Sequence, residues 1–219
     1  MQFNRQRTNL IDCDEHGTGT ELFVVEGLSA SNSVARVRDA RFQAVLPMQG
    51  KPMNAAKASR QSVRRNEWFV ALVDALGCGW EPTSNASMRF DRVLLLFDPD
   101  ADGIHCGLLV LLFFERYLRP ILESNRLSVV KAPMFEIRAT GYGDRLHAYS
   151  EDHLRRLREA LDERKIDHRS QRYRGLASLS AGALHETCID PESRTAHLLE
   201  ATDAAEARRV LGPKKKAML

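Results

Sequence analysis

The chain has 219 residues, of which 43% are hydrophobic and 28% are charged. This composition is close to the average of globular proteins and excludes a wholly disordered, collagen-like or coiled-coil protein. The formal net charge is only +3, because 32 basic residues are nearly balanced by 29 acidic ones. A nucleic-acid partner is compatible with this charge, but its binding surface would have to be local.

The cysteines and the N-terminus indicate the cellular compartment in which the protein is expected. The four cysteines are far apart in the sequence, without the short spacings of zinc ligands or of a small disulfide framework, and indicate free thiols in a reducing compartment. The N-terminus has no apolar stretch of the signal-peptide kind, and the longest apolar run, residues 108–114, is much shorter than the roughly 20 residues that span a bilayer. We therefore expect a cytoplasmic protein with no membrane partner.

Short apolar segments alternate with longer segments of helical periodicity along the first part of the chain. The predicted strands are residues 22–25, 44–46, 93–97 and 127–131, and the predicted helices are residues 29–38, 61–76 and 105–122. The strand at 93–97 has no polar alternation, as is typical of a parallel strand covered on both faces. This order predicts an α/β fold, in which helices flank a mainly parallel sheet of about four strands.

The second part of the chain begins with two more predicted strands, residues 135–138 and 146–149, which should form a hairpin across a glycine-rich turn at 141–144. A charged amphipathic helix is expected at 151–165, with Ser150 as its N-cap. The remainder is less regular and ends in a lysine-rich tail at 214–216.

Acidic residues follow two of the predicted strands at the point where each strand ends. Glu26 follows the first strand, and three more acids follow the strand that ends at residue 97: Asp98, Asp100 and Asp102. Because the carboxyl ends of parallel strands meet in a common crevice, these side chains are expected to lie together. Carboxylates gathered without a cation would repel one another and raise their pKa values. A divalent cation is the simplest explanation, and all-oxygen ligands favour Mg²⁺ or Mn²⁺ over Zn²⁺.

Two other interpretations of the acidic run are weaker. The run resembles the start of a calcium-binding loop, but the twelfth position of such a loop requires Glu, and counting from Asp98 gives Leu109. The acids could instead cap the helix that begins near His105, a role that needs one of them rather than three. Metal binding is therefore the favoured interpretation.

Seven segments, taken together, resemble one known family. Two of them contain the acids, and the full set is residues 21–27, 41–47, 50–54, 98–105, 113–116, 171–176 and 190–194. In this order they resemble the TOPRIM region of the B subunits of bacterial type IIA DNA topoisomerases, namely DNA gyrase and topoisomerase IV. The resemblance implies a Rossmann-like TOPRIM domain at 21–150, after a lead-in at 1–20, and a small gyrase-B-like, α-helical C-terminal extension at 151–219.

The resemblance also implies roles for single residues. Glu26, Asp98 and Asp100 would be the catalytic residues that hold Mg²⁺ during DNA cleavage and religation, with Asp102 as a further ligand. DNA contacts would come from residues outside the acidic set: Lys51, Asn54, His105, Arg172 and Arg174. The segment that contains the two arginines, residues 171–175, resembles the family segment that packs back toward the cleavage core. The implied partners are DNA and an A-type subunit that supplies the nucleophilic tyrosine. No segment matches an ATP site, which leaves a separate ATPase chain open as a further partner, and the protein would be nucleoid-associated.

The sequence departs from the family pattern around the implied DNA surface. Leu28 stands where the family usually has an acid, Gln49 where it has a basic residue, and Gly107 where it has Arg. Ser31 and Asn32 replace two glycines, and the end of the 173–179 segment is also altered. These changes remove charge and glycine flexibility, whereas the acidic residues themselves are all present.

Three functions remain open at this point. We expect the Mg²⁺-binding component of a type IIA topoisomerase, an isomerase that is not self-sufficient and needs an A-type subunit. The alternative is a non-catalytic module that binds an A-type subunit or DNA as a regulator, which Leu28, Gln49 and the altered 173–179 segment favour. The third is an independent nuclease in which metal-activated water replaces the tyrosine. The C-terminal extension argues against a nuclease, which would not need it.

Overall fold

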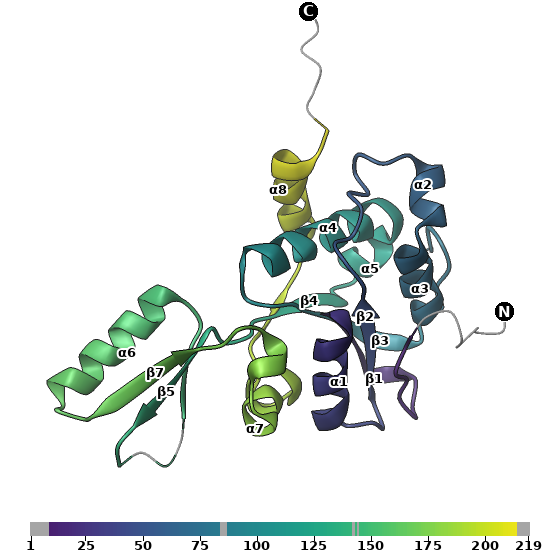
Figure 1. Cartoon of the computed structure of the whole chain (residues 1–219). Coiled ribbons are helices and arrows are strands. Elements are labelled where there is room, and N and C mark those ends of the chain that lie inside the picture. Colours follow the sequence, from purple (N-terminus) through teal and green to yellow (C-terminus); the bar gives the residue numbers. More distant parts are fainter. Residues whose placement is uncertain (1–8, 84–86, 142, 144, 214–219) are drawn as a thin grey trace, which may run out of the picture.

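The computed structural model describes residues 9–83, 87–141, 143 and 145–213. Figure 1 shows a larger body and a smaller lobe that contains α6, β5 and β7. The strands are β1 (Gly17–Glu26), β2 (Gln43–Met48), β3 (Phe90–Leu96), β4 (Leu127–Val130), β5 (Phe135–Ala139), β6 (Leu146–Ala148), β7 (His168–Arg172) and β8 (Ala196–Leu198). The α-helices are α1 (Gly27–Val37), α2 (Arg60–Arg65), α3 (Glu67–Leu76), α4 (Ala101–Tyr117), α5 (Arg119–Glu123), α6 (Glu151–Glu163), α7 (Ala181–Leu184) and α8 (Ala201–Leu211). A 3₁₀ helix, η2 (Leu176–Ser178), and a π-helical turn, η3 (His185–Ile189), complete the fold.

The large sheet has the strand order β2-β1-β3-β4-β8. Its first four strands are parallel, and β8 pairs with β4 in the antiparallel direction. Helices cover both faces, as Figure 1 shows for α1 on one side and α4 on the other. The α/β fold with a mainly parallel sheet is thus confirmed, with β8 as a fifth strand that the sequence did not reveal.

The core follows from the two-residue periodicity of the strands, in which successive side chains point to opposite faces. In β1, Leu22 and Val24 pack in the cluster that contains the apolar sides of α3 and α4. Phe23 and Val25 point to the other face and pack against α1, η2, α7 and η3. All four side chains are fully buried. A continuous apolar run is therefore required here, and such a run predicts a strand buried on both faces.

The small sheet has the order β6-β5-β7 and is antiparallel throughout. The pairing of Phe135 with Ala148 confirms the expected hairpin, although residues 142 and 144 of its turn lie outside the described residues. Helix α6 covers the sheet through Leu154 and Leu161, and Ser150 caps it by accepting the N–H of His153. The lysine-rich tail at 214–216 also lies outside the described residues.

The C-terminal region contains two strands besides its helices. Strand β7 completes the small sheet and β8 the large one, while α8 packs against α4 with a 2.9 Å ion pair between Arg208 and Glu115. The boundary proposed at residue 150 therefore falls between strands of the same small sheet. No helix of the described residues is long and apolar enough to cross a membrane.

Two predicted helices are each interrupted. The segment 61–76 forms α2 and α3, because Asn66 leaves the helical conformation and caps α3 by accepting the N–H of Phe69. The segment 105–122 begins earlier, at Ala101, and breaks at Leu118. Pro120 follows this break in the first turn of α5, where a proline is tolerated, whereas it would disrupt a helix interior.

Candidate metal centre

The acidic residues lie at the carboxyl edge of the large sheet. Strands β1 and β3 are neighbours and parallel, with Val25 paired with Leu96. Glu26 is the last residue of β1 and Asp98 lies two residues past the end of β3, so the two acids lie at the ends of adjacent strands. Gly27 turns the chain from β1 into α1 with a φ of +75°, a conformation that a side chain at Cβ would disfavour. Glu26 is the N-cap residue of α1, but its side chain makes no capping hydrogen bond. Its carboxylate is therefore not used by the helix.

Asp100 occupies a different local position, because it is the N-cap residue of α4. Its Oδ1 accepts the N–H of Gly103 at 2.8 Å. Gly103 is required for close packing, since a Cβ there would lie 2.0 Å from the carbonyl oxygen of Asp98. One of the three acids in this run is thus a helix cap, as the capping interpretation allowed, while Asp98 and Asp102 have other contacts.

Asp102 pairs with Lys51 on the surface. The Nζ of Lys51 lies 2.8 Å from Oδ1 of Asp102, and this neighbour holds the pKa of the carboxyl below its usual range. The Lys51 and Asp102 side chains are 45% and 78% exposed. Such an exposed ion pair is weak, so an incoming phosphate could replace the carboxylate as the partner of the lysine.

Burial and mutual repulsion destabilise the charged forms of two of these acids. The pKa of Glu26 is raised by burial first, and then by the negative charges of the three aspartates. The pKa of Asp98 is raised by burial and by Asp100, and lowered by a hydrogen bond from the Leu176 backbone. A cation between these oxygens would relieve the repulsion, and carboxylate ligands suit Mg²⁺. No three of these carboxylates, all of which the structure describes, have oxygens within 4.8 Å of one another, so a bound cation would have to draw the side chains together.

This electrostatic arrangement predicts that Glu26→Gln raises the thermal unfolding midpoint of the metal-free protein at about pH 7. Because the folded-state pKa of Glu26 is raised, its ionisation costs stability, and that cost appears as the pH rises through this pKa. The gain from the substitution should therefore shrink toward about pH 4, where wild-type Glu26 is protonated. Thermal melts followed by circular dichroism in the presence of a chelator measure both effects.

The matched control for this prediction is Asp102→Asn. Lys51 lowers the pKa of Asp102, so its charge is favourable in the fold and its removal should not stabilise the protein at about pH 7. If the unfolding midpoint of Glu26→Gln at this pH is equal to or below that of the wild type, ionised Glu26 does not destabilise the fold, and the raised pKa is contradicted.

Comparison with known proteins agrees with this arrangement. Residues 21–131, from β1 to just beyond β4, match the Toprim domain family. The chain belongs to the Toprim domain family. It is 36% identical to the DNA gyrase B subunit of Thermotoga maritima over 203 residues, 92% of this chain and 31% of that protein. It is 35% identical to the DNA topoisomerase 4 B subunit of Enterococcus faecalis over 192 residues, 86% of this chain and 28% of that protein.

A third relative, the DNA gyrase B subunit of Archaeoglobus fulgidus, is 36% identical over 200 residues, 90% of this chain and 31% of that protein. The chain thus spans about three-tenths of the length of these curated relatives. The comparisons support a topoisomerase-related role for this Toprim domain.

Two arginines that are candidate DNA contacts, Arg172 and Arg174, lie beside the acids. A cavity of about 400 Å³ is lined by Arg172 and Arg174 together with Asp98 and Asp100. Arg174 also lines a second cavity, of about 320 Å³, which contains Glu26. Both arginines are exposed, but Arg172 already lies 3.6 Å from Glu151 and over the ring of Phe135, so Arg174 is the better placed of the two for an anionic ligand that approaches the acids.

The structure places the other two candidates differently. His105 is half-buried in α4 and lies close enough to Asp102 for its charge to lower the pKa of that carboxyl. Asn54 instead donates to the carbonyl of Leu211 at 2.9 Å, at the end of α8, and its Oδ1 accepts backbone N–H groups of the following turn. The Asn54 amide thus stabilises the loop that carries Lys51 rather than pointing to a ligand.

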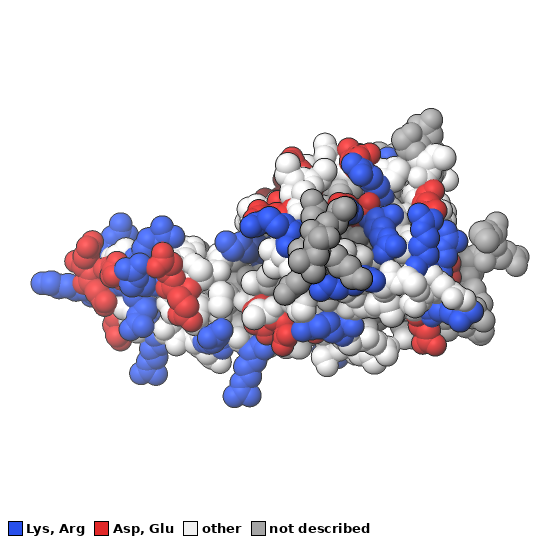
Figure 2. Space-filling view, turned by 90° about the horizontal axis from the view of Figure 1, so that it is seen from above, with Lys and Arg blue, Asp and Glu red and all other residues white. Residues whose placement is uncertain are grey.

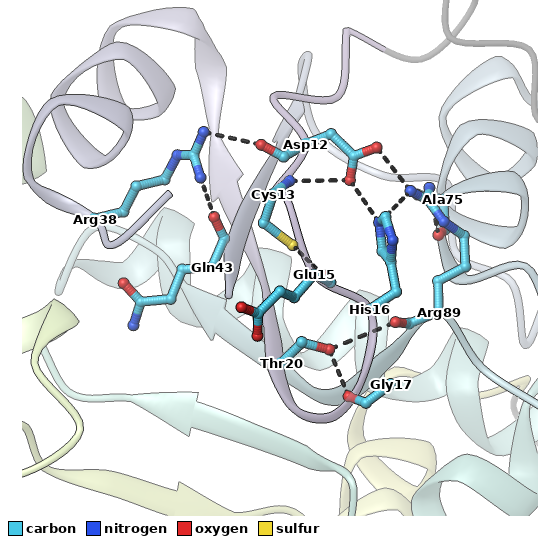
Figure 3. A network of polar contacts seen from close by, with 10 residues as sticks. All are labelled: Asp12, Cys13, Glu15, His16, Gly17, Thr20, Arg38, Gln43, Ala75 and Arg89. Carbon is cyan, nitrogen blue, oxygen red and sulfur yellow. Dashed lines mark hydrogen bonds and ion pairs between the residues drawn. The ribbon is translucent and has the colours of Figure 1, made fainter. Parts of the chain in front are cut away.

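A polar network lies near the start of β1, at the end of the strand opposite to Glu26, and the sequence does not predict it (Figure 3). Among the described residues, Asp12, Cys13 and His16 form the one group whose metal-ligating atoms all lie within 4.8 Å of one another. The guanidinium of Arg89 lies 2.7 Å from Asp12 and 2.6 Å from His16, where a cation would otherwise be favourable. Burial raises the pKa of Cys13 to about 11, so the thiol stays protonated. This network joins the lead-in to the chain before β3.

Proposed function

We propose that this Toprim chain is the Mg²⁺-binding component of a type IIA DNA topoisomerase, and that it supports DNA cleavage and religation with a tyrosine-bearing A-type subunit. The observation that carries the proposal is the position of Glu26 and Asp98 at the ends of two neighbouring parallel strands, with Asp100 and Asp102 beside them. The similarity to gyrase and topoisomerase IV B subunits supports the choice of reaction. Such a protein would be cytoplasmic and nucleoid-associated.

The acids would hold the cation, with Glu26, Asp98 and Asp100 as ligands and Asp102 in support, and Mn²⁺ could replace Mg²⁺. When bound, the cation offsets the negative charge that develops on a phosphodiester during in-line displacement. The Asp98 carboxylate is held by a hydrogen bond from the backbone N–H of Leu176. The Asp100 carboxylate is held by a hydrogen bond from the N–H of Gly103 in the first turn of α4. These anchors keep the two carboxylates at one edge of the sheet.

The basic residues around the acids would bind and orient the DNA backbone. Lys51 follows β2 and pairs with Asp102, whereas Arg174 follows β7 and lines the same cavity as Glu26. The two basic residues thus reach the acidic set from segments that are far apart in the sequence. His105 and Arg172 would add contacts on either side. In the view of Figure 2, basic and acidic side chains are interspersed on the lobe that contains the small sheet, so the described residues on this face of the lobe form no continuous basic surface for DNA.

Salt-dependent DNA binding should reveal the contact made by Arg174. We expect Arg174→Ala to weaken binding of a short duplex and to reduce the slope of log affinity against log salt concentration by about 1, because one phosphate contact is lost. Fluorescence anisotropy over a series of salt concentrations measures this. Arg158→Ala is the control, since Arg158 is also exposed but lies on α6 and lines neither cavity. Equal slopes for the two variants would contradict the assignment.

The tyrosines support the need for a separate nucleophile. Tyr117 is 1% exposed, and the hydroxyl of Tyr173 donates to Glu136 at 2.9 Å. Burial raises the pKa of Tyr149, which makes its phenolate less accessible. Tyr142 lies outside the described residues. None of the described tyrosines is thus an activated, exposed hydroxyl, and we assign the role of the nucleophile to an A-type subunit.

A regulatory module is the second candidate function, and one observation favours it. Leu28, two residues after Glu26, is 53% exposed, and Ile104, two residues after Asp102, is 62% exposed. Apolar side chains at these places suit contact with a protein better than contact with phosphates. In this case the chain would bind an A-type subunit without supporting cleavage.

Trapping of covalent protein–DNA complexes distinguishes the candidates. Purified chain, a cognate A-type subunit, supercoiled plasmid and Mg²⁺ are mixed and quenched with detergent. We expect covalent complexes only when both proteins and Mg²⁺ are present, and their loss with Glu26→Ala. Binding of the two proteins without covalent complexes would favour the regulatory module, and cleavage by this chain alone would favour a nuclease.

A further inference from the structure

A segment of the C-terminal region reaches Asp98 from a distant part of the sequence. The N–H of Leu176 donates to Oδ1 of Asp98 at 2.7 Å, although the two residues are 78 positions apart. Leu176 belongs to residues 173–178, which follow β7 of the small sheet and which we call the arm. Asp98 follows β3 of the large sheet. The arm therefore links the small sheet to the acidic set.

The first part of the arm is fixed to the small sheet. The N–H of Tyr173 donates to the carbonyl of Met134 at 2.9 Å, and its hydroxyl donates to Glu136 at 2.9 Å. The Glu136 carboxylate is 5% exposed and also accepts hydrogen bonds from Arg138 and Arg145. Tyr173 is therefore anchored to the small sheet through both its backbone and its side chain.

The second part of the arm is fixed to the large sheet. The Leu176 side chain is 1% exposed and packs in the cluster that contains Phe23 and Val25 of β1. The hydroxyl of Ser178 accepts the N–H of Arg174 at 3.0 Å and donates to the carbonyl of Gly175 at 2.7 Å. These bonds close the turn and orient the Leu176 N–H toward the acid.

Gly175 allows the arm to approach the carboxylate directly. Its φ is +153° and its ψ is 177°, a region of backbone conformation that only glycine adopts readily. A Cβ at this position would lie 2.6 Å from Oδ2 and 3.0 Å from Cγ of Asp98. Any side chain here would displace the carboxylate or the arm.

We propose that Gly175 and Leu176 are positioning residues that hold the Asp98 carboxylate in the orientation needed to bind the cation. This inference rests on the proposed Mg²⁺ site. The two oxygens of a carboxylate have about four lone-pair directions, so one hydrogen bond leaves Asp98 able to ligate a cation. Because the site is complete only when the arm is docked, a bound cation must in turn stabilise the docked arm.

The first test measures Mg²⁺ affinity by calorimetry for Gly175→Ala, with Gly79→Ala as the matched control. Gly79 also has a positive φ, of +72°, but a Cβ there meets nothing within 4 Å. We expect an affinity at least about tenfold lower for Gly175→Ala, as for loss of a positioning contact behind a metal ligand, and an unchanged affinity for Gly79→Ala. A folded Gly175→Ala variant with wild-type affinity would overturn the inference. Absence of Mg²⁺ binding by the wild type would instead overturn the proposed function, and with it this inference.

The second test uses the wild-type protein, so it stands even where Gly175→Ala does not fold. Hydrogen exchange of the Leu176 amide is followed by NMR with and without Mg²⁺, and the Leu72 amide in α3 is the remote reference. At a Mg²⁺ concentration of about ten times Kd, exchange through arm opening should slow about tenfold relative to that reference. Unchanged exchange at Leu176 while calorimetry records Mg²⁺ binding would contradict the coupling.

Discussion

Replacement of Arg194 by Ala should lower the free energy of unfolding by about 3–5 kcal/mol, because it leaves a carboxylate buried without its cation. Arg194 and Glu21 are each 4% exposed, and Nη1 of Arg194 donates to Glu21 at 2.8 Å and to the carbonyl of Ile189 at 2.8 Å. Gln43 would remain as a hydrogen-bond donor to Glu21, at 2.9 Å, but it carries no charge. Urea unfolding followed by circular dichroism measures the loss.

The control is Arg41→Ala, whose partner is Asp39. That ion pair has a similar distance, 2.7 Å, but its side chains are 70% and 35% exposed, so its removal should change the stability little. Replacing both members of the buried pair, as in Glu21→Leu with Arg194→Met, should restore much of the stability, since a buried pair exchanged for apolar side chains is often neutral. An Arg194→Ala variant as stable as Arg41→Ala would show that the buried pair contributes nothing.

The second large effect concerns catalysis with the A-type subunit. Asp98→Asn should reduce the rate of Mg²⁺-dependent DNA cleavage by roughly 100-fold or more, because charge stabilisation by a bound cation contributes several kcal/mol to the transition state. The amide oxygen of Asn can still accept the N–H of Leu176, so the fold should be retained. Single-turnover cleavage of a labelled duplex measures the rate.

Asp102→Asn is the matched control for this variant. Asp102 is 78% exposed and already paired with Lys51, so we expect a much smaller loss of cleavage rate. A rate for Asp98→Asn equal to that of Asp102→Asn would remove Asp98 from the reaction and leave the acidic run as a structural cap of α4.

The parts of the fold that the sequence predicts are those in which local pattern and burial agree. The interior of β3, from Val93 to Leu96, is buried on both faces, so its sequence is an uninterrupted apolar run whose end marks the acids. In contrast, every residue of β8 is exposed, and β7 is polar and almost wholly exposed. Neither strand has an apolar periodicity, because each forms only where an existing sheet edge supplies partners.

The candidate site shows the same division. The acids could be predicted because their side-chain types are read directly from the sequence and the ends of the apolar runs mark the ends of the strands. The resemblance implies that residues 171–175 pack toward the cleavage core, but the hydrogen bond from Leu176 to Asp98 was not predictable, since its donor is a backbone N–H that any residue would offer. Within this segment Gly175 is the residue whose identity the contact requires, because its missing Cβ makes room for the carboxylate.

A crystal of this chain soaked in Mn²⁺ and measured at the manganese absorption edge tests the central claim most directly. The anomalous difference map should contain a peak between the carboxylates of Glu26 and Asp98, and this peak should be absent from crystals of Asp98→Asn. A map with no peak at saturating Mn²⁺, or with its peak at Asp12, Cys13 and His16 instead, would contradict the assignment of the metal site to the carboxyl edge of the large sheet.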